Sequence, residues 1–303
     1  MIRHLRHTDI DTAEWDDRLL ACMNKLWYAQ SHVLGIASPG WEALMDEENG
    51  AIMPLTWRKK LGISYLFQPF GLQQLGVFSR TAITPETASA FIAAVPKRFK
   101  LAEIAVNPVM PVPTNAGWTS TEHPDQLLDL SVGIEQVRLN YAKGHDRNLR
   151  KGQEGGMHVQ PMEPKAFVDL FERTTAKRFG GMDAQGLRSL LPLLQAADER
   201  GEADIIGVRG EHGWSAGVAF IHWHGRCILL KSAADEEGRG TNAMFHLVDA
   251  GIDRACRHSR LLDFAGSEHP GTARFYEGFG AHRSVYLRLT MNDLPFWLKP
   301  FKR

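Results

Sequence analysis

Two short segments in the last third of the chain carry residue types that could bind an anion and move a proton. The first holds a glycine pair, Gly238 and Gly240, between an expected strand and an expected helix. Backbone N–H groups left accessible by glycines, together with the dipole of a helix N-terminus, suit a bound diphosphate. The alternative is a tight turn that caps the helix. The candidate anion-binding residues are Gly238, Arg239, Gly240, Thr241 and Asn242.

The second segment is TARFYEGFGA, from Thr272 to Ala281. Phe275 and Phe279 are four residues apart and can pack inward from one helical face, which leaves Tyr276 on a neighbouring face. A phenol at this place could give a proton to a departing thiolate, so Tyr276 is a candidate general acid. The alternative is a tyrosine at the edge of the core whose hydroxyl meets water or backbone.

A general base and residues for an acceptor are also needed. Lys231, late on an expected strand, could serve as the base if burial lowers its pKa. His222 lies on the preceding strand and could titrate near neutrality, or it could belong to a half-exposed sheet face. Asp263 could orient an amine or cap the following loop. Gln68 and Gln73 are candidates to bind substrate in a cleft between domains, or they are ordinary turn residues.

A locally basic segment runs from Lys143 to Lys151. It could contact a donor phosphate or the backbone of a tRNA. A solvated helix face is the alternative, because the chain as a whole carries no excess of positive charge.

The elements expected in the second half are those that must position these residues. A meander of strands is expected at 204–209, 214–224 and 227–232, with a two-residue turn at Gly225-Arg226. A helix at 241–257, a strand at 261–264, a helix at 270–279 and a strand at 285–289 follow. The strand–helix–strand crossover predicts a parallel pair inside a mixed sheet. Before the meander we expect a short strand at 127–130 and helices at 134–152, 165–179 and 187–200.

The first half is less regular. It predicts a strand at 2–7, a helix at 13–23, a hairpin within 50–68 that turns at 58–62, a helix beginning at Thr84-Pro85, and a strand at 101–106. A proline-rich passage from 108 to 124 then separates this half from the rest. A length of 303 residues suits two domains. We therefore predict domains at 1–124 and 125–303.

Composition excludes several classes of protein. Lys+Arg and Asp+Glu both number 35, so no global field attracts DNA or an anionic membrane. The three cysteines, Cys22, Cys227 and Cys256, are widely spaced, which argues against a disulfide framework or a metal site. The sequence has neither an apolar signal core nor an apolar run of about 20 residues. These features predict a cytoplasmic protein without a membrane span or a metal, and they leave the oligomeric state open.

Taken together, the two segments resemble the GNAT superfamily of N-acetyltransferases. The family's acyl-CoA loop has the pattern (Arg/Gln)-x-x-Gly-x-(Gly/Ala), and the stretch from Asp235 to Gly240 matches both of its small residues but has Asp235 at the first position. The family's tyrosine helix has an aromatic residue or leucine before the tyrosine and a glycine four residues after it. Phe275, Tyr276 and Gly280 match this pattern. In the family this tyrosine often acts as the general acid.

The stretch from Leu261 to Ser267, followed closely by that helix, also resembles the Fem-type peptidyltransferase branch, whose members contain two GNAT-like domains. The stretch from Pro54 to Ser79 looks like the degenerate first domain of such proteins. The resemblance implies an α/β fold of tandem GNAT-like domains, each a mostly antiparallel mixed sheet with flanking helices and a splayed parallel strand pair. The acyl donor would lie between the splayed strands, with backbone groups of Ala233 and Ala234 holding its pantetheine arm.

Three functions remain open. The first is an N-acyltransferase that uses acetyl-CoA or another acyl-CoA, in which the amine of a small-molecule or peptide-like acceptor attacks the thioester directly. The second is a Fem-type peptidyltransferase that uses aminoacyl-tRNA. The acidic residues before Gly238 favour this one, because such an enzyme needs no clamp for the CoA diphosphate. The third is a catalytically silent binding protein with a GNAT fold, favoured by the missing basic residue at position 235.

Overall fold

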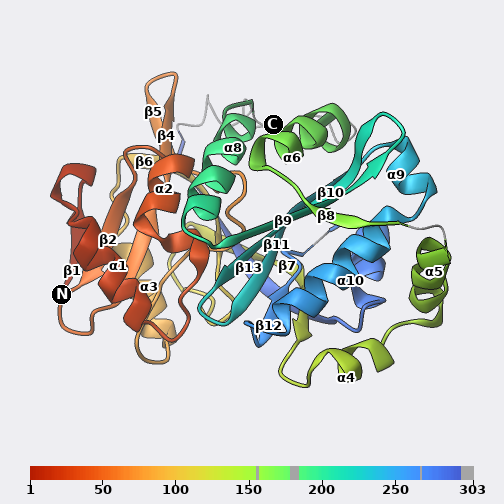
Figure 1. Cartoon of the computed structure of the whole chain (residues 1–303). Helices are drawn as coiled ribbons and strands as arrows, with labels where there is room; N and C mark the ends of the chain where they lie inside the picture. Colours follow the sequence, from red (N-terminus) through yellow and green to blue (C-terminus); the bar gives the residue numbers. More distant parts are fainter. Residues whose placement is uncertain (155–156, 178–183, 267, 295–303) are drawn as a thin grey trace. The chain divides into compact units, whose positions relative to one another are not determined.

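The structure is a computed structural model, and it describes residues 1–154, 157–177, 184–266 and 268–294. Two compact units emerge (Figure 1). The N-terminal unit is Met1–His123 together with the chain from Val285 onward, and the C-terminal unit is Pro124–Ser284. The predicted domains are continuous in sequence, whereas the N-terminal unit also includes the last strand of the chain.

The N-terminal unit contains two groups of strands. One is an antiparallel sheet with the order β1 (Ile2–Leu5), β2 (Glu42–Asp46) and β3 (Ile52–Leu55). The other has the order β4 (Trp57–Lys60), β5 (Ile63–Leu66), β6 (Phe99–Val106) and β13 (His282–Asn292). Strands β5 and β6 are parallel, and the neighbours on either side of them are antiparallel. The unit therefore has one parallel pair inside a mostly antiparallel arrangement.

Local sequence explains where the helices of this unit begin. They are α1 (Thr12–Ala21), α2 (Ser31–Ala37) and α3 (Pro85–Ala93), with the short 3₁₀ turns η1 (His7–Asp9) and η2 (Trp27–Ala29). Asp11 caps α1 by accepting from the N–H groups of Ala13 and Glu14. Thr84 caps α3, which starts at a proline as expected. Trp15 and Phe91 project from α1 and α3 and are fully buried.

The C-terminal unit is one mixed sheet with the strand order β7 (Trp118–Asp129), β12 (Leu261–Asp263), β11 (Arg226–Ala234), β10 (Gly213–Trp223), β9 (Ala203–Gly210) and β8 (Val159–Pro161). Only β11 and β12 are parallel, and the other neighbours in this order are antiparallel. The predicted crossover through a helix into a parallel strand is thus present.

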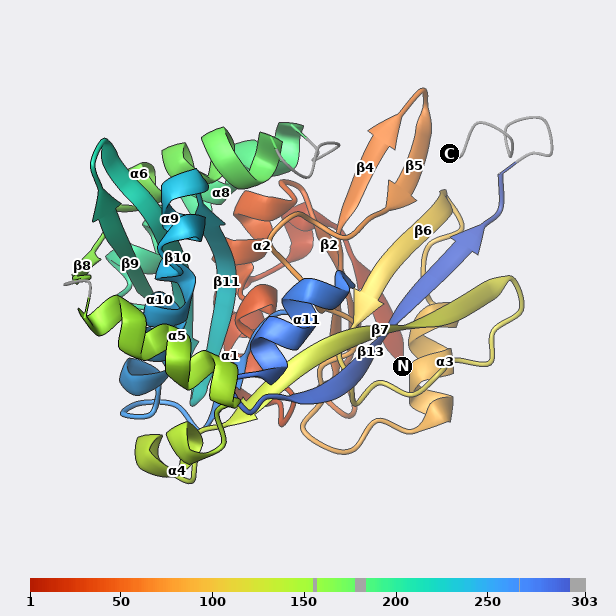
Figure 2. The ribbon, with the colours of Figure 1, turned by 90° about the vertical axis from the view of Figure 1, so that its right-hand side faces the viewer.

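Helices cover both faces of this sheet. Helices α6 (Pro164–Phe171) and α8 (Ala184–Glu199) lie on one face, and α5 (Lys143–Glu154) and α10 (Ala243–Ala255) lie on the other (Figure 1). Helix α10 comes very close to β10, since a Cβ atom built on Gly251 would lie 2.1 Å from the ring of Phe220. The remaining elements are α4 (Ile134–Leu139), a π-helical turn η3 (Glu172–Ala176), α9 (Glu236–Gly240) and α11 (Pro270–Glu277). Helix α11 lies beside β11 (Figure 2).

Several local expectations need correction. The turn of the β10–β11 hairpin is His224-Gly225, not Gly225-Arg226, because both central residues have a positive φ as a type I′ turn requires. The helix expected at 134–152 is split into α4 and α5. Within the hairpin expected at 50–68, only residues 57–66 form a hairpin, made of β4 and β5. The preceding strand, β3, pairs with β2 instead. Residues 178–179 of one expected helix, and Ser267, lie outside the described residues.

The last strand shows the largest difference. Residues 287–292 of β13 pair with β6 in the N-terminal unit, although the sequence placed this strand in the second domain. None of the described helices is long and apolar enough to cross a membrane.

Candidate functional site

The two parallel strands of the C-terminal unit separate at a defined point. Their pairing runs from Arg226 opposite Leu261 to Ile228 opposite Asp263 and then stops. Strand β11 continues beyond this point, and it contains a β-bulge at Leu230, where its register with β10 shifts. Bulges bend a strand and increase its twist, and they occur often beside active sites. The result is a splayed strand pair at the centre of this sheet.

Tyr276 lies across this splay. Its hydroxyl lies near the side chain of Ser232 on β11. Its ring stacks on Phe264, directly after β12, with ring centroids 4.5 Å apart and planes inclined by 18°. The side chain is buried, and burial raises the pKa of the phenol to about 12. The phenol is therefore protonated at neutral pH and can donate a hydrogen bond or a proton at the splay.

Lys231 immediately precedes Ser232 on the same strand. Burial lowers the pKa of its amine to about 8. Successive side chains of a strand point to opposite faces. Because Ser232 faces α11, Lys231 belongs to the face covered by α6 and η3. The structure thus places a proton donor and a possible proton acceptor on the two faces of one strand.

The open edge of β11 is where a donor's arm was expected to bind. The N–H of Asp235 donates to Ser215 on β10 (2.9 Å), so Ala233 also faces β10, and Ser232 and Ala234 face the open edge. The carbonyl of Ser232 accepts from the Thr175 hydroxyl (3.3 Å), and that of Ala234 accepts from Arg239 (2.6 Å). Of the two alanines predicted to hold a donor, only Ala234 presents its backbone at the open edge, and its carbonyl already has a partner.

The segment with the glycine pair is helical rather than an open loop. It forms α9, and the side chain of Asp235 caps it by accepting from the N–H of Gly238 (3.0 Å). The N–H groups of Arg239, Thr241 and Asn242 donate to carbonyls within the segment. Four of the five amides predicted to bind an anion, those of Gly238, Arg239, Thr241 and Asn242, therefore donate to groups of the protein in this structure.

The two glycines have different roles. A Cβ atom on Gly238 would lie 2.4 Å from the carbonyl oxygen of Ser215, so Gly238 lets α9 pack closely on β10. A Cβ atom on Gly240 would meet nothing within 4 Å. Asn242 has a left-handed backbone and joins α9 to α10, and the hydroxyl of Thr241 donates to the Glu237 carbonyl. This segment is therefore held by packing and by its own hydrogen bonds.

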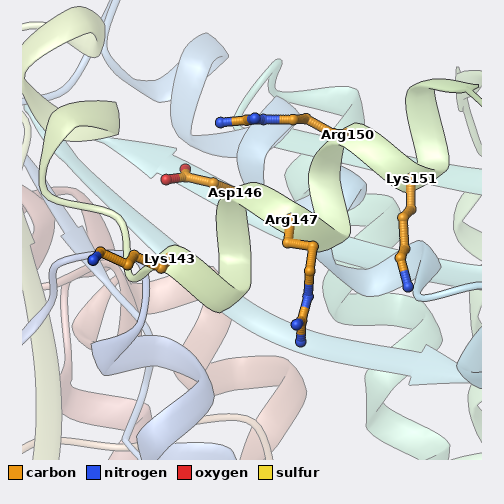
Figure 3. A pocket seen from close by; sticks show the side chains of 5 residues that line it. All are labelled: Lys143, Asp146, Arg147, Arg150 and Lys151. Carbon is orange, nitrogen blue, oxygen red and sulfur yellow. The ribbon is translucent and has the colours of Figure 1, made fainter.

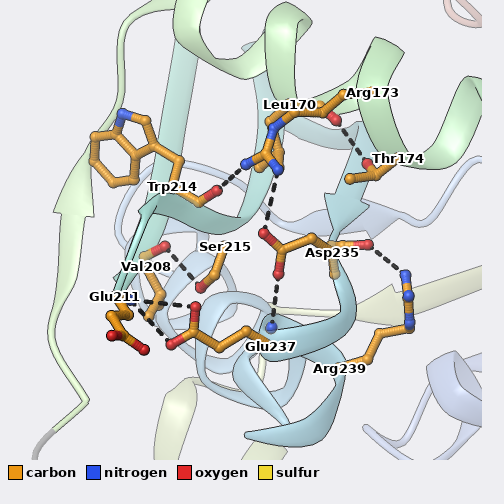
Figure 4. Close-up of polar contacts among 12 residues, drawn as sticks. Leu170, Arg173, Thr174, Val208, Glu211, Trp214, Ser215, Asp235, Glu237 and Arg239 are labelled. Atoms are coloured by element: carbon orange, nitrogen blue, oxygen red, sulfur yellow. Dashed lines mark hydrogen bonds and ion pairs between the residues drawn. The ribbon is translucent and has the colours of Figure 1, made fainter.

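A charged hollow of about 440 Å³ lies beside α9. Arg173, from the π-helical turn, forms a salt bridge with Asp235 (3.3 Å) and donates to the carbonyl of Trp214 (Figure 4). π-helical turns are often found at functional sites. The lining residues are Arg173, Thr174, Lys177, Asp235, Glu236 and Arg239. Three cations against two carboxylates leave a small excess of positive charge next to the open edge of β11.

The candidate acceptor residues are not gathered at the splay. Asp263 is buried, accepts from Arg226 (2.6 Å) and also from the N–H of Ala265 (2.7 Å), which favours its loop-capping alternative. His222 pairs with Cys227, at the other end of the strands and roughly 13 Å along β10 from the position opposite Ser232. Burial lowers the pKa of His222.

The two glutamines belong to the N-terminal unit. The side chain of Gln68 donates to the carbonyl of Leu72 (2.6 Å) and accepts from the N–H of Ala105 (2.8 Å). Gln73 accepts from the side chain of Gln74 (3.1 Å). Gln68 therefore braces its own loop, and its role in substrate binding, like that of Gln73, stays a prediction.

No protein-family model and no curated protein matches this chain. A solved structure of FemX is similar over 97% of this chain and 99% of that one, with a TM-score of 0.71 and 13% identity. A tandem GNAT protein from the clavulanic acid biosynthesis pathway is similar over 97% and 99%, with a TM-score of 0.55 and 14% identity. This chain has the tandem GNAT-like fold. The C-terminal domain of a putative lysylphosphatidylglycerol synthetase from Agrobacterium fabrum is a further GNAT-like match, with a TM-score of 0.58, 11% identity, and 93% and 92% of the two chains covered.

This GNAT-like fold confirms the predicted fold class, including a splayed parallel pair. Helix α5 adds a basic surface to it (Figure 3). Four exposed cations on this helix, together with Asp146, line a hollow of about 320 Å³: Lys143, Arg147, Arg150 and Lys151. Within the described part of the chain, none of the four forms a salt bridge.

Sequence reasoning missed three residues around the splay and α9. Ser232 and Phe264 hold Tyr276, and Arg173 braces α9 through Asp235. Ser232 and Phe264 could have been found from the strands themselves, since both flank the predicted parallel pair. Nothing in the spacing of Arg173 points to Asp235, which is 62 residues away.

Proposed function

We propose that this chain transfers an acyl group from an activated carrier to an amine at the splay between β11 and β12. The observation that carries this proposal is the position of Tyr276, whose ring stacks on Phe264 beside one strand and whose hydroxyl meets Ser232 on the other. An acyl carbonyl held between the two strands lies within the sheet. Groups on either face of the sheet can therefore approach it from opposite sides.

The two faces supply the two proton transfers that direct attack requires. The amine attacks the acyl carbon from the side of Lys231, and the new C–N bond forms as the bond to the carrier breaks. The amine loses one proton to Lys231, and the leaving atom of the carrier gains one from Tyr276. No covalent intermediate on the protein is needed.

The first candidate donor is acetyl-CoA or another acyl-CoA. The cationic hollow beside α9 supports it, because Arg173, Lys177 and Arg239 would face the phosphates of a carrier that runs along the open edge of β11. The amide of Gly238 would not take part, since it already donates to Asp235. The acceptor would be a small-molecule or peptide-like amine in the cytoplasm, and no metal takes part in these steps.

The second candidate donor is an aminoacyl ester on tRNA, and two observations favour it. The N-cap at Asp235 occupies the amide of Gly238, one of those expected to bind a CoA diphosphate. An ordinary thiol has a pKa of about 8.5, so a phenol with a pKa of about 12 would protonate a thiolate against about 5 kcal/mol. The alkoxide released from an oxygen ester is a much stronger base than a thiolate, which makes the same phenol a better-matched acid.

Charge reversal on α5 separates the two donors. If tRNA is the donor, Arg147→Glu/Arg150→Glu should weaken binding of aminoacyl-tRNA by about tenfold or more, and the dependence of log affinity on log salt should become shallower by about two. Binding is measured by filter retention at several salt concentrations. The matched control is Lys59→Glu/Lys60→Glu, which reverses two exposed cations on the β4–β5 hairpin and should leave affinity nearly unchanged.

Binding of acetyl-CoA tests the other candidate donor. If acyl-CoA is the donor, it should raise the melting temperature of the wild-type chain, with about 2.7 kcal/mol of stabilisation at a concentration 100 times Kd. The α5 variant should keep that response. Failure of both acetyl-CoA and aminoacyl-tRNA to stabilise or bind the chain would contradict the proposed function and favour a silent GNAT-like binding protein.

The role of Lys231 predicts a pH dependence. A general base works only when deprotonated, so kcat/KM for transfer should rise about tenfold per pH unit below the pKa of about 8 and level off above it. Lys231→Met should flatten this rise and lower the plateau. The measurement is initial rates between pH 6 and 9.5 with either donor. An unchanged profile in Lys231→Met would remove Lys231 from the reaction.

A further inference from the structure

Helix α11, which carries Tyr276, is held at its C-terminal end by a side chain from α5. The imidazole Nε2 of His145 lies 2.8 Å from the carbonyl oxygen of Phe275. A carbonyl can only accept, so Nε2 must carry the hydrogen. The backbone N–H groups that follow α11 donate to the carbonyls of Arg274, Tyr276 and Glu277. His145 thus supplies the donor for the remaining carbonyl of that turn.

The imidazole is enclosed by three aromatic rings. Its centroid lies 4.5 Å from that of Phe279, 4.8 Å from that of Phe245 and 5.6 Å from that of Phe275. Burial lowers the pKa of His145, so the ring is neutral at physiological pH. The rings come from α10, α11 and the residues after α11. Rotation of the imidazole would therefore disturb all three segments.

Gly278 brings α5 and α11 together. A Cβ atom on this residue would lie 1.9 Å from the imidazole of His145. Its φ is −66°, so the backbone would accept any residue and only this contact requires glycine. The carbonyl of Gly278 also accepts from the N–H of Ala142, just before α5, at 2.9 Å. Helices α5 and α11 are therefore held together by the close packing of His145 on Gly278 and by the hydrogen bond from Ala142 to Gly278.

We propose that His145 is a positioning residue that holds the last turn of α11, and through it keeps the Tyr276 hydroxyl against Ser232. Phe275, whose carbonyl His145 binds, is adjacent to Tyr276. A turn of the helix without this bond can rotate, and the phenol then moves away from the splay. The kinetic consequence rests on the proposed function, whereas the position of the phenol does not.

Two substitutions at position 145 separate the hydrogen bond from the packing. His145→Phe keeps a ring among the three phenylalanines but removes the donor. His145→Gln keeps an N–H donor at nearly the reach of Nε2. We expect kcat for transfer to fall about tenfold or more in His145→Phe, with KM for the donor within about twofold, because small misplacements of a reacting group are costly. His145→Gln should recover most of kcat.

The position of the phenol is read independently of activity by NMR of the chain labelled at tyrosine ¹³Cζ. The chain has five tyrosines, and the resonance of Tyr276 is the one missing from Tyr276→Phe. We expect His145→Phe to shift this resonance and to leave those of Tyr28, Tyr65 and Tyr286 in place, and His145→Gln to restore it. Gly278→Ala should produce the same shift by displacing the imidazole. The matched control is Gly144→Ala on α5, where a Cβ atom meets nothing within 4 Å.

The outcomes are distinct. An unmoved Tyr276 resonance in folded His145→Phe overturns the positioning role, whatever the kinetics. A shifted resonance that His145→Gln restores supports it, even if Tyr276→Phe shows that the phenol takes no part in acyl transfer. A loss of kcat that His145→Gln does not restore, with no shift of the resonance, also overturns it.

Discussion

Replacing Tyr276 with phenylalanine should slow acyl transfer by about 10²- to 10⁴-fold and leave donor affinity within about twofold. The substitution removes only the hydroxyl, and the ring can stay stacked on Phe264. The hydroxyl acts on the leaving atom in the transition state, so its loss should reduce kcat and kcat/KM together. Rates are measured in single turnovers with saturating donor and a primary amine, and affinity is measured separately on the same samples.

A matched control for this substitution is Tyr65→Phe. Tyr65 lies on β5 in the N-terminal unit and its ring packs edge-on against Phe67. The control removes a hydroxyl of the same kind from the other unit, so it should leave kcat unchanged. Equal kcat in Tyr276→Phe and the wild-type chain would show that the phenol is not the general acid. The position of Tyr276 would then no longer support the proposed function.

The two glycines of α9 should respond to alanine in opposite ways. Gly238→Ala should lower the free energy of unfolding by about 2–4 kcal/mol, because the new methyl group collides with the backbone of Ser215 and the neighbouring strand cannot yield easily. Gly240→Ala should change stability little, or raise it by up to about 1 kcal/mol, since alanine favours a helix and meets open space. Both values come from urea unfolding followed by circular dichroism.

The two glycine substitutions also test whether α9 is a packed helix or an open anion-binding loop. If the two glycines instead formed an open anion-binding loop, both substitutions would have similar effects on stability and both would weaken donor binding. Our structure predicts that Gly240→Ala binds its donor normally. A loss of stability in Gly240→Ala as large as that in Gly238→Ala would contradict the packing described for α9.

The charges around α9 explain how an acidic segment fits beside an expected anion site. Asp235 caps the helix and pairs with Arg173, and Glu237 accepts from the N–H of Glu211 (3.1 Å). Two of the three acidic side chains are therefore directed to protein partners, and Glu236 lines the hollow. Asp235 and Glu237 are therefore part of the scaffold beside the splay, and Asp235 also holds Arg173 in place.

The sequence by itself predicted the β9–β11 meander, α10, β12 and α11, and the resemblance of its motifs predicted the fold class. The meander, the patterned helix α10 and the spacing of Phe275, Tyr276 and Phe279 are properties of short stretches. Hydrophobic periodicity is sufficient to predict such stretches, because it reflects which side chains of one element must be buried. The parallel pair followed from the strand–helix–strand crossover.

Only the tertiary structure decided which partners these elements meet. The N-cap at Asp235 takes up the N–H of Gly238, which the glycine pattern alone leaves available, and β13 pairs with β6 of the N-terminal unit. Tyr276 gains its neighbours Ser232, on β11, and Phe264, directly after β12, only when the sheet is assembled. Each of these contacts joins residues whose mutual distance depends on the packing of the whole sheet, and no local pattern encodes such a distance.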